Sequence, residues 1–163
     1  MRLPLRTVSA ALTFAITLAG LASCTPEQAL APAVDIEHTS FAASLGVDLS
    51  KMTKTSSGMY YQDGPVGVGT TVVSGYHVTV HYTLYLTNGT VVQTSVGGAP
   101  FGFTVGANPL QVIAGFNEGM IGMKVGGTRK MVIPASLGYG AVDNGSIPAN
   151  SVLVFSVQLI SVP

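Results

Sequence analysis

Few residues of this sequence could carry acid–base, metal or covalent chemistry. The chain of 163 residues has three histidines and one cysteine. His77 and His81 lie four residues apart in a segment with the alternation of a β-strand, which places them about 13 Å apart, too far to share one metal ion. No serine, histidine and aspartate occur in a context typical of a nucleophilic triad. The glycines at 67–69 and 138–140 do not connect a strand to a helix, as a phosphate-binding loop requires. The sequence therefore argues against metal, nucleophilic and phosphate-binding sites.

The charge balance argues against a polyanionic partner. Charged residues make up only 9% of the chain and hydrophobic residues 47%. Seven basic residues face seven acidic ones, and without Arg2 and Arg6 five basic residues would face seven acidic ones, a net charge of −2. Because electrostatic steering toward nucleic acid needs a basic surface, we expect no nucleic-acid partner and favour an apolar or uncharged one.

Residues 1–23 have the pattern of a secretory signal. Arg2 and Arg6 precede an uncharged, apolar segment that runs from Thr7 to Ala22, as in a signal peptide. Its length, about sixteen residues, is short of the roughly twenty that span a bilayer. The motif Leu21-Ala22-Ser23-Cys24 resembles the bacterial lipobox, which implies cleavage before Cys24 and lipidation of Cys24. The protein would then be exported and anchored to the cell envelope, on the periplasmic side of the outer membrane in a Gram-negative organism. A plain signal peptide with a chance cysteine, or an uncleaved anchor, is the alternative.

Residues 24–57 are predicted to form the lipidated N-terminus and a linker. The segment is rich in Ala, Pro, Ser and Thr, and it shows no strong periodicity. Such a composition is typical of a connecting segment, part of which can dock on the domain that follows. That domain is expected to span residues 58–163.

Alternating apolar residues predict an antiparallel sheet. Residues 76–86 place Val78, Val80, Tyr82, Leu84 and Leu86 on one face, the pattern of a strand that is buried on one side. Asn88-Gly89 then predicts a hairpin with a type I′ turn and a returning strand at 90–95. Further strands are predicted at 58–62, 128–133 and 152–159.

One helical segment interrupts the strands. Residues 109–119 begin with a proline, which suits the first turn of a helix, and Val112, Ile113 and Phe116 share one face. Glycine-rich loops are expected at 96–100 and 138–150. The predicted fold class is α+β, an antiparallel twisted β-sheet that wraps one short α-helix.

Several separate motifs of the domain resemble the FKBP-type peptidyl-prolyl cis-trans isomerases. They are, in chain order, Val80-His81-Tyr82-Thr83, Pro100-Phe101-Gly102-Phe103, the segment 112–120, Gly138-Tyr139-Gly140 and Ile147-Pro148. Because they occur in the family's order over residues 58–163, the resemblance is more specific than any single motif. It implies an FKBP-like fold and isomerisation of X-Pro bonds in exported proteins, with folding assistance as the result.

The resemblance also implies a set of site residues. Those implied to be catalytic are Tyr82, Gln93, Phe101, Tyr139 and Ile147, and those implied to bind substrate are Val92, Val112, Ile113, Phe116 and Phe155. The Tyr139 hydroxyl and the Ile147 backbone N–H would donate to the twisted amide, and Phe116 would form the base of the pocket. The family's chemistry needs neither a cofactor nor a metal. Its partners would be proline-containing polypeptides and tacrolimus-like ligands.

Three departures from the family pattern bear on this expectation. Gln93 stands where the family has a characteristic Asp, Phe116 where most members have a Trp, and Val92 where a Phe is common. We therefore expect an isomerase weakened at Gln93, with reduced affinity for tacrolimus-like ligands. A non-catalytic peptide-binding module or holdase chaperone on the same fold is the alternative. A plain β-rich surface lipoprotein would explain the alternation but not the ordered motifs.

Overall fold

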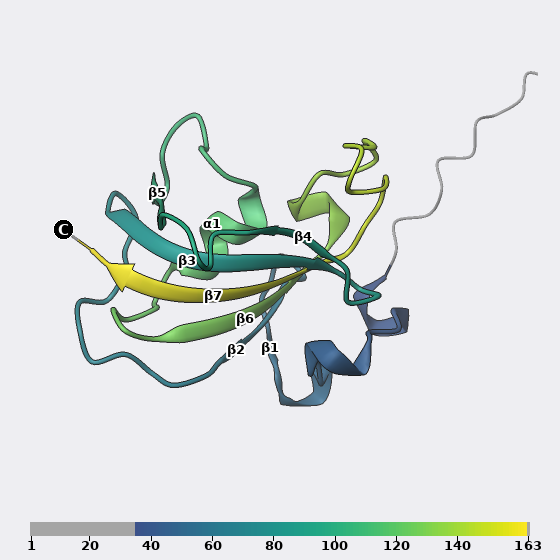
Figure 1. The fold of residues 1–163 in the computed structure, drawn as a ribbon, viewed down its shortest axis with the longest axis horizontal. Coiled ribbons are helices and arrows are strands. Elements are labelled where there is room, and N and C mark those ends of the chain that lie inside the picture. The colour runs from purple at the N-terminus through teal and green to yellow at the C-terminus, as the bar shows by residue number, and fades with distance from the viewer. Residues whose placement is uncertain (1–34, 163) are drawn as a thin grey trace, which may run out of the picture.

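Seven antiparallel strands curve around one short α-helix in the computed structural model, which describes residues 35–162 (Figure 1). The strands are β1 (Thr53–Lys54), β2 (Tyr60–Asp63), β3 (His77–Leu86), β4 (Val91–Thr94), β5 (Phe101–Thr104), β6 (Thr128–Ile133) and β7 (Leu153–Ser161). Their order across the sheet is β1-β2-β6-β7-β3-β4, and β5 also pairs with β3. The predicted fold class is confirmed. Cys24 and the predicted signal peptide lie outside the described residues.

The long strands β3 and β7 form the centre of the sheet and carry much of the core. In β3, Val78, Val80 and Leu84 are buried on the inner face, whereas the alternate residues are only partly buried or exposed. Tyr82 pairs with Val157 of β7, and Leu84 pairs with Phe155. The period of two therefore places Tyr82 and Leu84 on the face that the helix covers.

Two of the buried positions of the helix α1 (Ala114–Met120) are glycines, which lets the helix lie close to β6. A Cβ atom at Gly115 would collide with the Ile133 side chain, and one at Gly119 would collide with Met131, both on β6. The prediction of a helix from residue 109 is wrong at its start. Residues 109–113 form a loop instead, and Ile113 has an extended backbone, with φ −58° and ψ 148°.

Arg129 fixes the far end of α1 to the sheet. Its guanidinium group donates to the carbonyl oxygens of Gly119 at 2.8 Å and Ile121 at 3.0 Å, where the helix ends. The same group donates to both carboxylate oxygens of Asp63, at 2.6 and 3.0 Å, and it lies 4.3 Å from the centre of the Tyr61 ring. Because the last carbonyl groups of a helix lack partners within it, this buried side chain completes the helix end.

The hairpin between β3 and β4 forms as predicted, but its turn type differs. Gly89 has φ 89°, and among the described residues Asn150 is the only non-glycine residue with positive φ, so Asn88 does not adopt the type I′ conformation. The Leu86 N–H donates to the Thr90 carbonyl at 2.9 Å, which makes a three-residue loop. Gly89 takes the left-handed position that such a loop requires.

A strap at the N-terminus, residues 36–52, covers part of the outer face of the sheet. It contains three 3₁₀ turns, η1 (Ile36–His38), η2 (Ala43–Leu45) and η3 (Leu49–Lys51); a fourth turn, η4 (Ala135–Leu137), follows β6. The strap buries three of its apolar side chains against residues of β2 and β6 and against the start of β7 with the residue before it. Ile36, Leu45 and Met52 pack with Tyr60, Val132, Val152 and Val154. The strap lies in the range predicted as linker, so the packed unit begins earlier than residue 58.

Polar contacts also attach the strap. The Glu37 carboxylate accepts hydrogen bonds from Lys54 Nζ at 2.6 Å and from the Tyr60 hydroxyl at 2.7 Å. The Ala42 N–H donates to the Thr87 carbonyl at 2.8 Å, which joins the strap to the β3–β4 hairpin. Within residues 35–162, no helix has the length and apolar character needed to cross a membrane.

Candidate functional site

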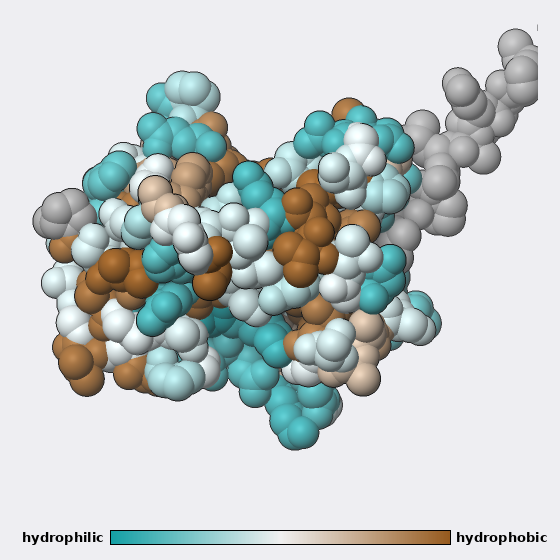
Figure 2. Space-filling view, in the orientation of Figure 1, coloured by the Kyte–Doolittle hydropathy of each residue, from teal (hydrophilic) through white to brown (hydrophobic). Residues whose placement is uncertain are grey.

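A cavity of about 210 Å³ opens between α1, the centre of the sheet and two loops. The loop before α1 and the loop over residues 138–150 rise on either side of a notch in the surface (Figures 1 and 2). The cavity is lined by Tyr82, Leu84, Gln93, Phe101, Gln111, Val112, Ile113, Phe116, Tyr139 and Phe155. All the predicted site residues except Val92 and Ile147 are therefore brought together in one place. We call this space the aromatic cavity.

Phe116 lies at the centre of the aromatic contacts around the cavity, as its place in the motif predicts. Its side chain is only 3% exposed. Its ring centre lies 5.0 Å from that of Phe155, 5.6 Å from Phe103 and 5.8 Å from Tyr82. Tyr82 in turn meets Phe101 edge to face at 5.8 Å. Tilted and edge-to-face contacts at these distances are the favourable arrangements for aromatic rings, so the rings support one another as a rigid wall.

Tyr139 reaches the cavity from the loop that follows η4. The Gly140 N–H donates to the Ala135 carbonyl, and the Asn150 N–H donates to the Gly140 carbonyl, both at 2.8 Å. Gly140 has φ 64°, a conformation that a residue with a side chain rarely adopts. These bonds hold the residue that follows Tyr139, whose half-buried ring packs against the core and lines the cavity. Tyr139 therefore contributes both to the core packing and to the lining of the cavity.

Two predicted residues lie elsewhere. Ile147 is 4% exposed and belongs to the core, and its carbonyl accepts from the Asn144 N–H at 3.0 Å. Val92 is half-buried and packs against the same core. Neither is among the residues that line the aromatic cavity.

Two lining residues were not predicted as site residues. Leu84 could have been found from the alternation of β3, because it follows Tyr82 by two positions on the same face. Gln111 had no such signal, since it is a single polar residue in an irregular loop. Its Oε1 atom accepts a hydrogen bond from the Thr104 N–H at 2.8 Å, a contact between segments that no local pattern indicates.

The aromatic cavity contains almost no ionisable chemistry. Among its lining residues only Tyr82 and Tyr139 can titrate. Burial raises the pKa of Tyr82, and the nearby Tyr139 raises it further, so the Tyr82 hydroxyl stays protonated at neutral pH and can donate a hydrogen bond. Among the described residues, no group of three or more His, Cys, Asp or Glu side chains is placed to hold a metal ion. The cavity is suited to bind an apolar ring beside a neutral amide.

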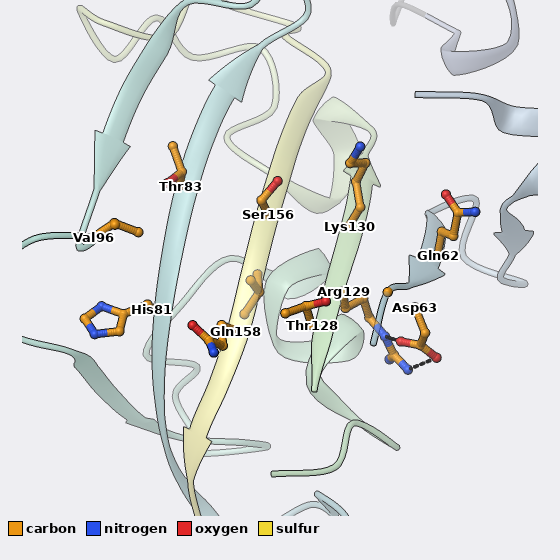
Figure 3. Close-up of a pocket in the computed structure, with 12 residues that line it drawn as sticks. Gln62, Asp63, His81, Thr83, Val96, Thr128, Arg129, Lys130, Ser156 and Gln158 are labelled. Atoms are coloured by element: carbon orange, nitrogen blue, oxygen red, sulfur yellow. Dashed lines mark hydrogen bonds and ion pairs between the residues drawn. The ribbon is translucent and has the colours of Figure 1, made fainter. Parts of the chain in front are cut away.

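A larger hollow, of about 480 Å³, lies on the opposite face of the sheet (Figure 3). Polar side chains cross it in register, with Thr83 beside Ser156, Ser156 beside Lys130, and Lys130 beside Gln62. The strands β3 and β7, which also carry the predicted site residues Tyr82 and Phe155, contribute other residues to this hollow. The hollow contains none of the predicted site residues, so size alone would have indicated the wrong place.

Comparison with known proteins gave consistent matches. Residues 69–160 match the family model described as FKBP-type peptidyl-prolyl cis-trans isomerase. The FK506-binding protein of Neisseria meningitidis serogroup B is 43% identical over 64% of this chain and 96% of its own length. FK506-binding protein 4 of Chaetomium thermophilum is 43% identical over 73% of this chain. This chain spans 23% of that fungal relative.

Solved structures match as well. FkpA from Escherichia coli superposes with a TM-score of 0.63 and 35% identity, over 69% of this chain and 51% of its own. AtFKBP13 superposes with a TM-score of 0.63 and 32% identity, over 69% of this chain and 98% of its own. All the residues that line the aromatic cavity, from Tyr82 to Phe155, lie within residues 69–160, which match the family model.

Proposed function

Because the chain belongs to the FKBP-type peptidyl-prolyl cis-trans isomerase family, we propose that it isomerises X-Pro bonds of exported polypeptides and thereby assists their folding. The observation that carries the proposal is the convergence of residues from separate motifs on the aromatic cavity. Tyr82, Phe116, Tyr139 and Phe155 come from β3, α1, the loop after η4 and β7, and all four line it.

The reaction requires a site that stabilises a twisted amide, and it does not require an acid or a base. The peptide bond resists rotation by about 18–20 kcal/mol because of its partial double-bond character, and uncatalysed isomerisation at proline takes tens to hundreds of seconds. A site that binds the twisted amide more tightly than the planar one accelerates rotation. Removing water from the carbonyl group helps, because the charge-separated form that keeps the bond planar is favoured by water.

The lining residues divide this work among them. Phe116 and Phe155 receive the proline ring and exclude water from it. The hydroxyl groups of Tyr82 and Tyr139 donate to the carbonyl oxygen atoms that flank the ring. Ile113 lines the cavity and Ile147 does not, and within residues 35–162 the Ile113 N–H donates no hydrogen bond. The Ile113 backbone, rather than that of Ile147, is therefore the candidate backbone donor.

The proposal is tested by measuring proline isomerisation with the full chain purified in detergent. Tyr139→Phe removes only the hydroxyl group and should lower kcat/KM about 2- to 12-fold, the equivalent of one neutral hydrogen bond of about 0.5–1.5 kcal/mol. Tyr85→Phe is the matched control, because Tyr85 packs against the strap cluster on the other face and should behave as the wild type. Absence of catalysis by the wild type would refute the proposal.

Gln93 supports a second candidate, a peptide-binding module or holdase chaperone without catalysis. Gln93 lies exposed on the edge strand β4 and presents a neutral amide to the aromatic cavity. An amide can replace a hydrogen bond of the family's Asp but not its charge. If both the wild type and Gln93→Asp bind proline peptides and suppress aggregation without catalysing isomerisation, the chaperone function replaces the enzyme.

Tacrolimus-like ligands are proposed to bind with reduced affinity. Phe116 provides a smaller floor than the Trp that most members have, so a ligand packed on it buries less apolar surface. Phe116→Trp should therefore bind tacrolimus more tightly than the wild type in a calorimetric titration. Equal or weaker binding would show that the floor does not limit affinity.

Export and lipid anchoring are proposed from the sequence of the first 24 residues. An uncharged apolar segment ends in Leu21-Ala22-Ser23-Cys24, and two or more acyl chains on one residue hold a protein stably on a membrane. In a Gram-negative cell, the outer membrane facing the periplasm is the proposed location. Cys24→Ser should release the protein from membranes or stall its processing, and mass spectrometry that finds Cys24 unacylated in the mature wild type would refute the anchor.

A further inference from the structure

Gln111 stands at the mouth of the aromatic cavity, on the loop between β5 and α1. Its side chain is exposed, whereas the next two residues, Val112 and Ile113, are half-buried and line the cavity. Its Oε1 atom accepts from the Thr104 N–H at 2.8 Å. Thr104 ends β5, the strand that also carries Phe101 of the cavity wall. Gln111 therefore joins two walls of the mouth.

The bond to Thr104 determines which way the amide of Gln111 faces. A backbone N–H can only donate, so the group that it meets must be the amide oxygen, and this removes the usual ambiguity between oxygen and nitrogen. The Nε2 group, with two donor hydrogens, is then directed away from Thr104. Among the hydrogen bonds of the described residues none uses Gln111 Nε2. A fixed donor without a protein partner thus lies at the entrance to the cavity.

We propose that the Gln111 side-chain amide is a specificity-determining donor, which binds a backbone carbonyl oxygen of the polypeptide next to the proline. The proposal rests on the isomerase function and names the part of its substrate that this residue recognises. A peptide with its proline ring in the aromatic cavity must extend out through the mouth, where its carbonyl groups come within reach of the Gln111 amide. The substrate class is therefore an extended polypeptide on at least one side of the proline, rather than proline alone.

The position at the mouth also determines which kinetic constant should change. A contact with a carbonyl group that does not rotate is equally strong in the bound substrate and in the twisted state, so its loss raises KM and leaves kcat unchanged. One neutral hydrogen bond corresponds to about a 2- to 12-fold change in KM. The Tyr139 hydroxyl, which is proposed to act on the twisted amide, should change kcat instead.

Two substitutions separate binding of substrate from anchoring of the loop. Gln111→Glu keeps an oxygen for the Thr104 N–H and replaces the amide donor with a second oxygen. Gln111→Met removes both functions at similar length and without charge. Asn117→Asp is the matched control, because the Asn117 Oδ1 atom accepts from the Gly106 N–H at 2.8 Å and so anchors the same loop, while its side chain does not line the aromatic cavity.

The experiment uses the full chain in detergent and exchange-broadened NMR of a blocked Ala-Leu-Pro-Phe peptide, which gives Kd, KM and kcat in one sample. We expect both Gln111 variants to raise KM about 2- to 12-fold at unchanged kcat, and Asn117→Asp to match the wild type. If Gln111→Glu behaves as the wild type, whatever Gln111→Met does, Gln111 only anchors the loop or does nothing, and the proposal is wrong. An equal effect of Asn117→Asp would also overturn it, because loop position or charge would then be the cause.

Failure of the isomerase function can be distinguished from failure of the donor. If the wild type does not catalyse isomerisation but binds the peptide, Kd replaces KM as the measure and the same comparison of variants decides. If the wild type neither catalyses nor binds, the donor assignment fails together with the function. An amide proton spectrum of each variant confirms that it is folded.

Discussion

Replacing Phe116 tests whether one ring serves both as core and as the floor of the cavity. The substitution of a buried Phe by Ala costs about 3–5 kcal/mol in free energy of unfolding. Phe116 is 3% exposed and touches three other rings, which favours the upper part of that range. The space that its ring would leave joins a cavity already open to solvent, which favours the lower part because no sealed void forms. We expect a loss of about 4 kcal/mol.

Thermal and chemical unfolding measure this loss. For a domain of this size, about 4 kcal/mol corresponds to a fall in Tm of roughly 12–16 °C, and the denaturant midpoint should fall without a change in slope. Isomerase activity, measured well below the new Tm, should fall as well, because the proline ring loses its floor.

A matched pair of milder variants separates the two roles. Phe103 is as deeply buried as Phe116 and touches it at 5.6 Å, but it does not line the aromatic cavity. Phe116→Leu and Phe103→Leu should lose similar stability, and only Phe116→Leu should lose activity in proportion to the lost floor. A stability loss below about 1.5 kcal/mol for Phe116→Ala would contradict the core role. Equal loss of activity in both Leu variants would contradict the floor role.

Three further outcomes are expected. Gln93→Asp should raise kcat/KM by about two- to fivefold, a modest gain because the carboxylate would be exposed on β4, and an unchanged rate would show that no charge is needed there. Activity should stay flat from about pH 6 to about pH 8, because the lining contains no His, Cys, Asp, Glu, Lys or Arg side chain and burial raises the pKa of Tyr82. A bell-shaped profile would indicate an acid or base outside the lining. Hydrogen bonds from Lys54 and then Tyr60 lower the pKa of Glu37 from 4.5, so its contribution is present above that pH and lost as the pH falls through the folded-state value. Glu37→Gln should therefore show a smaller loss of Tm below about pH 4.5 than the wild type, and identical acid limbs would refute this contact.

The sequence predicted the parts of the fold that have a local period. Residues 128–133 form β6 as predicted, and β3 and β7 follow from alternation over long segments. The short strand β5 was missed, because four residues with a glycine among them show no period and pair only through contact with β3. The start of α1 was wrong because Pro109 suits a helix locally, whereas side-chain bonds of Gln111 and Asn117 hold the preceding loop.

The docking of the strap and the role of Gln111 at the site could not be predicted from local sequence patterns, because both depend on contacts between distant segments. Ile36, Leu45 and Met52 are spaced irregularly, and each is buried by a separate part of the strap, so no periodicity marks them. The aromatic lining was predicted because each ring belongs to a recognisable motif. Gln111 belongs to none, and Ile147 belongs to a motif but serves the core. A motif identifies residues that a fold requires, and only the structure distinguishes those that touch the cavity.

The docked strap also determines how far a lipid on Cys24 would let the domain travel. If residues 24–57 were a flexible tether, its roughly 34 residues could span at most about 120 Å. With the strap packed from Ile36 onward, only about 12 residues remain between Cys24 and the packed domain, and these could span at most about 42 Å. The largest accessible volume scales with the cube of that length, so docking reduces it about 20-fold and raises the local concentration of the domain at the bilayer by the same factor. An anchored protein with this geometry would act on chains within that reach of the membrane surface, rather than on those that diffuse through the compartment beyond it.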